Sequence, residues 1–362
     1  MHYNILALGG DRIGPEVLSA GIRVAEQVAA SAGIHLTIRR DLLHGACWEV
    51  HGTFCRDETV ADACSADAVL VGAIGAPKWD HIKVAGGAHM QDGLMRLRKE
   101  MAAYAGIRPA RHWPELAHRT PFEEGVANQS DIMIVREMSG GVMFAEPRRS
   151  FIENDLRCAL DTARYDESEI RRVALAAFEL ARSRKKKLVS TDKANVMESF
   201  KLWRTVVTEV SQDYPDVSLS HMYADNLAYQ ILMNPTQYDV VLCCNLLGDL
   251  LSDMTAVISG GLGMLPSACL CGPPQVGVKG IYEPVHGSAP DIAGSGIANP
   301  VGMIFSVGMM FEYTFGRPDL TLEIERAVLA AIADGFRTPD IGGASGTETV
   351  TGAIIERLAS SA

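Results

Sequence analysis

The stretch YDVVLCCNLLGDLLSD, residues 238–253, contains the pattern that decides the fold. Residues 240–243 form a short apolar run, as a buried strand does, and leucines then recur at helical spacing after Asn245. Asp249 and Asp253 lie four residues apart on this predicted helix, so their carboxylates share one face. A cation such as Mg²⁺ or Mn²⁺ would relieve their repulsion, because it prefers hard oxygen ligands. A solvated polar face opposite a leucine stripe explains the same pattern.

Length and composition indicate a globular protein with about two domains. The chain has 362 residues, of which 48% are hydrophobic and 21% are charged, and its formal net charge is −11. An acidic surface argues against binding to nucleic acid or to an anionic membrane. It does not argue against a small anionic substrate, because a pocket can be locally basic.

The sequence predicts a cytoplasmic protein. Its first residues, MHYNILALGGD, lack the basic start and the long apolar run of a secretion signal. The longest apolar stretch, residues 301–315, is shorter than the roughly 20 residues of a membrane span and predicts a buried helix. The eight cysteines show no zinc-site spacing, so we expect reduced thiols.

Strand-like and helix-like segments alternate along the chain, which predicts an α/β fold. We expect strands at residues 3–8, 34–39, 68–72, 131–135, 188–191, 217–222 and 240–243, and helices at about 15–31, 93–104, 167–184, 225–233, 300–315 and 320–335. The glycine-rich turn at residues 9–16 joins a strand to a helix N-terminus, a place suited to anionic groups. It is not the G-x-G-x-x-G dinucleotide motif, and no phosphate-binding Walker A sequence occurs.

Five further charged residues are candidates for chemistry. Arg98, Arg108 and Arg136 lie on three different predicted elements and would bind a dicarboxylate if they converge; otherwise, surface salt bridges account for them. Lys193 follows a strand and would be either a proton acceptor or an exposed side chain. Asp225 would be either a helix cap or a third metal-binding carboxylate.

Nine motifs together resemble the β-decarboxylating dehydrogenases, the family of isopropylmalate, isocitrate, tartrate and D-malate dehydrogenases. They are GDRIGPEV, GAIGAPKWD, LRKE, IRPA, VREMSGG, STDKANV, HMYADN, NLLGDLLSD and YEPVHGSAPDIAGSGIANP, and the likeness as a whole runs from Leu8 to nearly the C-terminus. The likeness is greatest to the isopropylmalate branch. It implies a two-domain α/β fold that is not the Rossmann fold. The first domain would be discontinuous, residues 1–103 plus 261–362, and residues 104–260 would form the second.

The resemblance also implies a homodimer with shared active sites and assigns roles to the charged residues. Lys193 and Asp225 would come from one subunit, and the three arginines with Asp249 and Asp253 would come from the other. Asp225, Asp249 and Asp253 would hold Mg²⁺ or Mn²⁺. The arginines would bind the carboxylates of a malate, and Lys193 would accept its hydroxyl proton as hydride passes to the cofactor.

The resemblance implies NAD as that cofactor. Asp291 would accept hydrogen bonds from the ribose hydroxyls and repel a 2′-phosphate, which favours NAD over NADP. The other residues expected around the cofactor are Ile13, Ala76, Gln91, Asn195, Glu283, His286, Gly287, Ser288, Ala289 and Asn299.

Three residues depart from the family pattern. Met143 stands where the family carries a tyrosine that would protonate the product carbon, and methionine has no proton to donate. Gln91 stands in place of a glutamate, and Arg12 in place of a glycine. Leu94, Met95 and Met143 would line the pocket for the substrate's side group, and the methionines favour a large, flexible pocket.

The leading hypothesis is therefore an NAD- and metal-dependent oxidative decarboxylation of a 3-substituted malate, either 3-isopropylmalate or a bulkier analogue. A tartrate- or D-malate-type dehydrogenase is the enzymatic alternative, although it would favour a polar residue over Leu94. A second alternative is that the protein is not an enzyme but a non-catalytic paralogue that binds a ligand without turnover.

Overall fold

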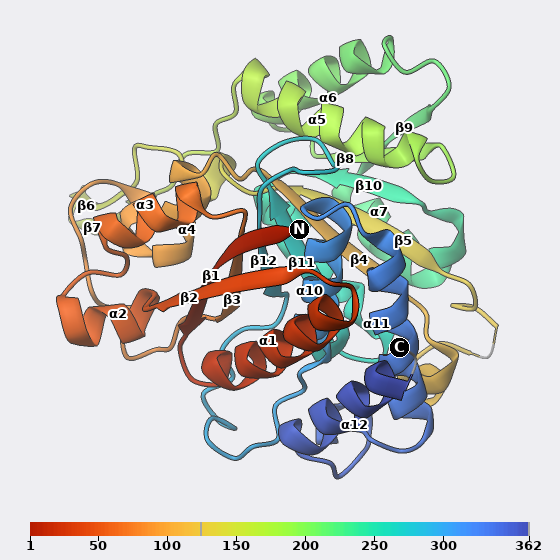
Figure 1. The fold of residues 1–362 in the computed structure, drawn as a ribbon. Coiled ribbons are helices and arrows are strands. Elements are labelled where there is room, and N and C mark those ends of the chain that lie inside the picture. Colours follow the sequence, from red (N-terminus) through yellow and green to blue (C-terminus); the bar gives the residue numbers. More distant parts are fainter. Residues whose placement is uncertain (124, 361–362) are drawn as a thin grey trace.

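A ten-stranded sheet runs through the centre of the molecule (Figure 1). The computed structural model describes residues 1–123 and 125–360. The strand order in the sheet is β2-β1-β3-β12-β11-β4-β5-β10-β8-β9, and a separate pair, β6 and β7, forms a hairpin. The strands are β1 His2–Gly10, β2 His35–Asp41, β3 Ala68–Ala73, β4 Ala105–Arg111, β5 Asp131–Glu137, β6 Arg149–Glu153, β7 Leu156–Leu160, β8 Lys187–Asp192, β9 Ser218–Tyr223, β10 Val240–Cys243, β11 Pro266–Leu270 and β12 Gly280–Pro284.

Helices cover both faces of this sheet (Figure 1). They are α1 Gly14–Ser31, α2 His44–His51, α3 Asp57–Ser65, α4 Gly93–Glu100, α5 Glu167–Arg182, α6 Glu198–Ser211, α7 Ala224–Met233, α8 Asn245–Met254, α9 Ala256–Ser259, α10 Val301–Tyr313, α11 Pro318–Ala333 and α12 Thr347–Ser360. Helix α10 packs on β11 and β12 with α1 and α11 beside it, and α12 packs on α1 and α11. The predicted α/β fold is confirmed.

The sheet is parallel on its two sides and antiparallel in its middle. Strands β2, β1, β3 and β12 are mutually parallel, as are β5, β10, β8 and β9. Between them, β11 and β4 are antiparallel to both of their neighbours, so the two outer groups run in opposite directions. Residues 1–103 and 261–362 supply one half of the sheet and residues 104–260 supply the other. The division into two domains at these positions stays a prediction.

Helix α10 forms the centre of the core. Every residue of Val301–Tyr313 except Glu312 is buried, as its continuous apolar sequence predicts. Among residues 1–123 and 125–360, no helix combines the length and the apolar character that a membrane span needs. All eight cysteines are free thiols, and five of them are buried.

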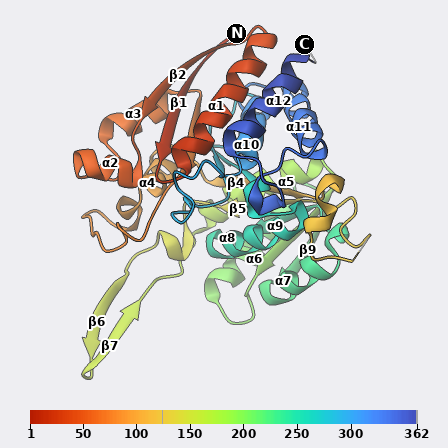
Figure 2. The ribbon, with the colours of Figure 1, turned by 90° about the horizontal axis from the view of Figure 1, so that it is seen from below.

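Several elements were not predicted from the sequence. The helix expected at residues 93–104 ends at Glu100, and the following residues form the central strand β4. Strands β11 and β12 and the helices α2, α3, α6, α9 and α12 were also missed. The β6–β7 hairpin, which projects away from the body, was missed as well (Figure 2). Its Ile152 and Leu156 are each 67% exposed.

Candidate active site

The turn after β1 brings the first glycine-rich motif against the loop that follows β12. Gly10 has φ +70°, and a side chain on Gly14 would lie 2.3 Å from the carbonyl oxygen of Gly9, so this turn requires small residues. The backbone N–H of Ile13 donates to the carbonyl of Ser288 at 3.2 Å. Two segments that the sequence assigned to the cofactor therefore meet.

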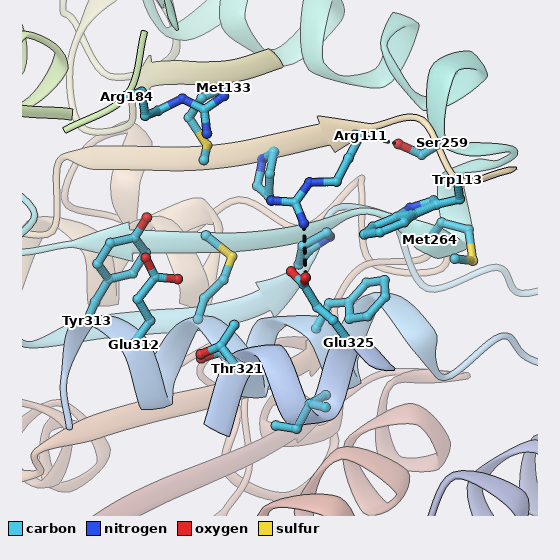
Figure 3. Close-up of a pocket in the computed structure, with 16 residues that line it drawn as sticks. Arg111, Trp113, Met133, Arg184, Ser259, Met264, Glu312, Tyr313, Thr321 and Glu325 are labelled. Atoms are coloured by element: carbon cyan, nitrogen blue, oxygen red, sulfur yellow. Dashed lines mark hydrogen bonds and ion pairs between the residues drawn. The ribbon is translucent and has the colours of Figure 1, made fainter. Parts of the chain in front are cut away.

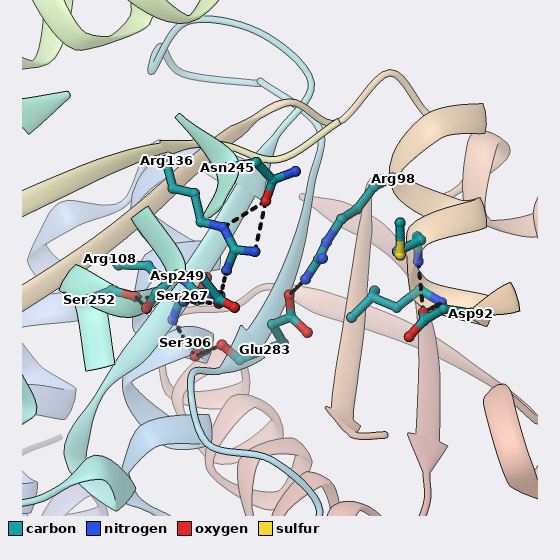
Figure 4. Close-up of polar contacts among 12 residues, drawn as sticks. Asp92, Arg98, Arg108, Arg136, Asn245, Asp249, Ser252, Ser267, Glu283 and Ser306 are labelled. Atoms are coloured by element: carbon teal, nitrogen blue, oxygen red, sulfur yellow. Dashed lines mark hydrogen bonds and ion pairs between the residues drawn. The ribbon is translucent and has the colours of Figure 1, made fainter. Parts of the chain in front are cut away.

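The three arginines converge on the start of helix α8 and the end of β12 (Figure 4). Arg98 comes from α4, Arg108 from β4 and Arg136 from β5. Strands β4 and β5 are antiparallel neighbours, and Asp249 follows the adjacent β10, which explains how distant segments meet here. The side chains of the three arginines are only 5–11% exposed. The alternative of surface salt bridges is therefore wrong.

Arg136 is held by two residues of α8. It forms an ion pair with Asp249, and its Nε and Nη2 donate to Oδ1 of Asn245 at 3.1 and 2.8 Å. Its Nη2 also lies 3.6 Å from Sδ of Met143, which places Met143 beside the arginine cluster. Asn245, which the sequence analysis took only as the end of a strand, is a positioning residue for Arg136.

Arg108 and Arg98 keep part of their hydrogen-bonding capacity free. Arg108 donates to Ser252 Oγ at 2.7 Å and lies 3.6 Å from Asp249 and 3.9 Å from Asp253. Arg98 donates to Glu283 at 2.5 Å. The Nε atoms of Arg98 and Arg108 are buried and have no hydrogen-bond partner among the described residues. Such donors fit an anionic ligand that would accept from them.

Burial and mutual repulsion shift the pKa values in this cluster. Burial, with the neighbouring Arg108, lowers the pKa of Arg136 to about 10. Burial also lowers the pKa of Arg108, whereas Glu283 outweighs burial and raises the pKa of Arg98. Burial and the nearby Asp249 raise the pKa of Asp253, although Arg108 opposes them. The arginines therefore favour an added anion, and the Asp249–Asp253 pair favours an added cation.

Lys193 and Asp225 form a second charged group. Nζ of Lys193 donates to Oδ1 of Asp225 at 2.6 Å, and this hydrogen bond lowers the pKa of Asp225. Tyr223 is the N-cap residue of α7 and Asp225 lies inside the first turn, so the alternative of Asp225 as the helix cap is wrong. Both residues line an apolar groove of about 390 Å³ together with Leu246 and Leu247 of α8.

One chain does not gather the three predicted metal ligands. Among residues 1–123 and 125–360, no group of three or more His, Cys, Asp or Glu side chains could hold a metal ion. Asp249 and Asp253 lie together on α8, 42% and 52% exposed, whereas Asp225 is paired with Lys193. The carboxylate pair has the donor chemistry that Mg²⁺ or Mn²⁺ prefers. A third carboxylate would have to come from elsewhere.

A cavity of about 360 Å³ contains five of the residues predicted for the cofactor: Ile13, His286, Gly287, Ala289 and Asn299. Nε2 of His286 is buried without a hydrogen-bond partner among the described residues, so the cavity offers an unused polar atom. Asp340 also lines the cavity and accepts a hydrogen bond from Asn299 at 3.0 Å. The sequence analysis missed Asp340, although the glycine pair that follows it was a signal of a tight turn.

Other residues assigned to the cofactor lie outside this cavity. Gln91 donates to and accepts from the backbone of Val84, so its amide is occupied within its own loop. Ala76 is buried beside Phe54 and Trp79, and Asn195 and Asp291 are exposed. Glu283 belongs to the arginine cluster, and the carbonyl of Ser288 holds Ile13.

The three side chains assigned to the substrate's side group differ in exposure. Leu94 is only 4% exposed and packs in a core cluster with Leu43 and Val71. Met95 and Met143 are partly exposed. The methionines therefore offer more surface to a ligand than Leu94 does.

A separate cavity of about 120 Å³ lies between the sheet and helices α10 and α11 (Figure 3). Arg111 pairs with Glu325 at 2.9 Å, and Arg184 pairs with Asp239 at 2.8 Å. Burial and the nearby Glu325 raise the pKa of Glu312. None of the residues predicted for the active site lines this cavity.

Comparison with known proteins identifies the family. Residues 4–358 match the isocitrate/isopropylmalate dehydrogenase family. The chain belongs to this family. It is 48% identical over 349 residues to the 3-isopropylmalate dehydrogenase of Ruegeria pomeroyi, which covers 96% of this chain and 95% of that protein. It is 42% identical to the 3-isopropylmalate dehydrogenase of Aquifex aeolicus, over 98% of this chain and 97% of that one.

Solved structures of the family have the same fold. The isocitrate dehydrogenase of Methylococcus capsulatus is 31% identical, covers 99% of both chains and has a TM-score of 0.86. The β-decarboxylating dehydrogenase of Thermococcus kodakarensis is 30% identical, with a TM-score of 0.78 over 99% of this chain and 96% of that one. The predicted isopropylmalate dehydrogenase-like fold is confirmed, and the chain is a member of a family of decarboxylating dehydrogenases.

Proposed function

We propose that this protein is an NAD- and divalent-metal-dependent dehydrogenase that oxidises and decarboxylates a 3-substituted malate. The observation that carries the proposal is a cluster of three buried arginines, in which Arg108 and Arg136 lie beside the Asp249–Asp253 pair and Arg98 pairs with Glu283. Arginines would neutralise a dicarboxylate, and the aspartates would hold the cation. A dicarboxylic hydroxy acid needs positive charge to bind its carboxylates, and the proposed metal-dependent reaction needs negative charge to hold the cation.

The substrate would bind with its carboxylates on the arginines. The buried, unpaired Nε atoms of Arg98 and Arg108 mark where carboxylate oxygens would find donors. The guanidinium of Arg136, whose Nη2 lies beside Met143, would also face the substrate carboxylates. The relatives named 3-isopropylmalate dehydrogenase favour 3-isopropylmalate or a bulkier analogue, with the side group against Met95 and Met143.

Asp249 and Asp253, with Asp225 of the partner subunit, would hold Mg²⁺ or Mn²⁺. The bound cation would supply Lewis-acid polarisation of the oxygen at the reacting carbon. Lys193 would accept the hydroxyl proton on Nζ as the alcohol is oxidised. Nζ of Lys193 donates to Asp225 at 2.6 Å, so Lys193 lies beside a carboxylate that would hold the cation.

NAD would occupy the cavity between Ile13 and Asn299 and would supply the hydride acceptor. Asp340 at the cavity and Asp291 outside it add negative charge on this side of the molecule. Carboxylates accept hydrogen bonds from ribose hydroxyls and repel a 2′-phosphate, which supports NAD over NADP.

A homodimer would complete the site. Leu246 and Leu250 of α8 are 42% and 58% exposed, beside the groove that contains Lys193 and Asp225. The β6–β7 hairpin, which projects from the body (Figure 2), also carries exposed apolar side chains. Exposed apolar side chains of this kind are expected to be buried against another copy of the chain. We place the dimer in the cytoplasm, where its eight free cysteines would stay reduced.

The proposed function can be tested by measuring NADH formation with 3-isopropylmalate, bulkier alkylmalates, D-malate, tartrate and isocitrate. Each assay is run with and without Mg²⁺ or Mn²⁺, and CO₂ release is followed in parallel. We expect metal-dependent NADH and CO₂ in equal amounts from an alkylmalate. Preference for D-malate or tartrate would support the alternative dehydrogenase, and bound NAD and metal without turnover would support a non-catalytic protein.

A matched pair of variants tests the binding site itself. Arg108→Gln removes a buried cation of the cluster, whereas Arg164→Gln removes an exposed one elsewhere. We expect the first to raise KM for the malate about 10- to 100-fold, the value of a charge-assisted hydrogen bond. The second should leave KM unchanged. Equal effects of the two variants would contradict the assignment of the cluster.

A further inference from the structure

His44 has an unusual backbone conformation for a residue with a side chain. It begins helix α2 with φ +54°, in the left-handed region that favours glycine. The residue is 8% exposed, and its ring stacks on Phe54 with centroids 4.8 Å apart. A backbone conformation of this kind persists where surrounding contacts fix it. Contacts of the imidazole are therefore expected to hold His44 in this backbone conformation.

The imidazole lies between two carboxylates from different elements. Its Nδ1 is 2.9 Å from Oδ2 of Asp11, in the turn after β1. Its Nε2 is 3.9 Å from Oδ2 of Asp92, the residue that precedes α4. Asp80, on the loop after β3, adds a further negative charge. On the far side, the guanidinium of Arg12 lies over Trp79, whose ring meets His44 edge-on.

The hydrogen bonds of Asp11 decide which nitrogen of His44 carries a proton. Asp11 accepts from the backbone N–H groups of Ala46 at 2.8 Å and Gly75 at 2.7 Å, so it acts as an ionised acceptor. Nδ1 of His44 must then donate to it. In a neutral imidazole, Nε2 would be an acceptor that faces the carboxylate of Asp92, whereas in the imidazolium both nitrogens are donors. The geometry therefore favours the charged form, and the raised pKa of His44 agrees.

Asp92 fixes the start of the helix that carries substrate-binding residues. Its Oδ1 caps α4 by accepting from the backbone N–H groups of Leu94 at 2.8 Å and Met95 at 2.9 Å. One helical turn later, α4 presents Arg98 to Glu283. The orientation of the Asp92 carboxylate therefore bears on both the side-group pocket and the arginine cluster (Figure 4).

Asp11 holds together the turn after β1 and the loop after β3, next to the cavity proposed for the cofactor. Its backbone N–H donates to Ala73 at 2.7 Å, and its carboxylate holds the loop at Gly75. Two residues later, Ile13 lines the cavity proposed for NAD. His44 thus joins the turn that shapes the cofactor cavity to the helix that shapes the substrate site.

We propose that His44 is a positioning residue whose imidazolium ties the Asp92 cap of α4 to Asp11 and so sets where Met95 and Arg98 face the substrate. This rests on the proposed function, because it takes α4 as a wall of the malate site. His44 itself does not touch the reacting atoms. Its loss should weaken malate binding more than it affects NAD binding or the chemical step.

Three variants separate this role from general stability. His44→Gln keeps one donor for Asp11 but loses the charge and the second donor. Asp92→Asn keeps a capping oxygen but removes the charge that faces His44. His51→Gln, at the exposed opposite end of α2, is the matched control. We expect the first two to raise KM for the malate several-fold, with KM for NAD and kcat nearly unchanged, and the double variant to add nothing further.

The pH dependence provides a readout that a purely structural role would not change. In the wild type, KM for the malate should rise as pH increases through the pKa of His44, and this rise should vanish in His44→Gln. A flat wild-type profile, or the same profile in His44→Gln, would overturn the proposal. If His44→Gln does not fold, the pH profile of KM for the malate is measured in Asp92→Asn instead. The rise of KM with pH should vanish in that variant, and an unchanged profile would overturn the proposal.

Hydrogen exchange keeps the test independent of turnover. The backbone N–H groups of Leu94 and Met95 should exchange faster in His44→Gln than in the wild type or His51→Gln. If no malate is oxidised but this difference is present, the proposed function fails while the His44 link stands. If malate is oxidised but exchange and KM match the His51→Gln control, the link itself is wrong.

Discussion

Nζ of Lys193 lies 2.6 Å from Oδ1 of Asp225, within a single chain and 32 residues apart in sequence. The two residues come from the end of β8 and the start of α7, which β8–β9 pairing brings together. Asp249 and Asp253 are instead paired with Arg108 and Arg136. One chain therefore has two separate charged groups, and in the proposed homodimer each group would be a half-site that the other completes.

Hybrid dimers test whether these half-sites join across subunits. Lys193→Met disables one half-site and Asp249→Asn the other, so each homodimer should be inactive. In an equal mixture after subunit exchange, half of the dimers are hybrids and each hybrid has one intact site. We expect about a quarter of wild-type activity to return. The measurement is NADH formation before and after mixing.

The control for this experiment is a mixture of Lys193→Met with Asp225→Asn. Both substitutions fall in the same half-site, so each site of the hybrid still contains one of the two defects and activity should not return. Recovery in both mixtures, or in neither, would contradict a site shared between subunits in the proposed way.

Mg²⁺ should stabilise the folded protein through Asp253. A cation that binds only the folded state at 100 times its Kd adds about 2.7 kcal/mol to the free energy of unfolding. Asp253→Asn should abolish this increment, although it relieves repulsion from Asp249 in the metal-free protein. The exposed Asp213→Asn is the control and should respond to Mg²⁺ as the wild type does. Thermal unfolding with and without Mg²⁺ measures the difference.

Replacing Met143 by tyrosine should restore a proton donor beside Arg136. Sδ of Met143 lies 3.6 Å from Nη2 of Arg136, so a phenol at this position would lie near the proposed carboxylate site. If protonation of the product carbon limits turnover, Met143→Tyr should raise kcat about 100-fold, the lower end of the range for general acid catalysis. Met143→Phe supplies the ring without the hydroxyl. Equal rates for the two variants would show that another group already donates the proton.

The contribution of His44 to folding stability should depend on pH. Burial opposes its charge, but the Asp11 hydrogen bond and the nearby carboxylates raise the pKa of His44 above its ordinary value of about 6.5. A raised folded-state pKa gives stability that is complete below about pH 6.5 and is lost as pH rises through the folded-state pKa. Burial likewise opposes the charge of Asp11, yet His44 and the Gly75 amide lower its pKa, so its contribution is lost only in acid.

Urea unfolding of the wild type and His44→Gln checks this expectation. The wild type should exceed the variant in free energy of unfolding by more at about pH 5.5 than at about pH 8.5, because the imidazolium is lost at the higher pH. A difference that does not change between these two values would mean that folding does not shift the pKa of His44, and a difference that grows with pH would mean that His44 is neutral in the folded protein.

The local elements could be predicted because their signals are local. Strand β10 and helix α8 follow from apolar periodicity within residues 238–253, and the burial of α10 follows from its continuous apolar sequence. Side-chain chemistry also identified candidate site residues, such as the carboxylates Asp249 and Asp253. These predictions need no information about distant parts of the chain.

The tertiary structure decided which of these charges meet and which do not. Arg108 lies on a central strand that the sequence did not predict, because its pairing with β11 and β5 depends on segments far apart in sequence. Long-range strand pairing also brings Arg136 to Asn245, whereas Gln91 is bonded to Val84 within its own loop. Sequence by itself determined the residue chemistry and the local elements, whereas side-chain convergence depended on sheet order and strand direction, which local periodicity does not encode.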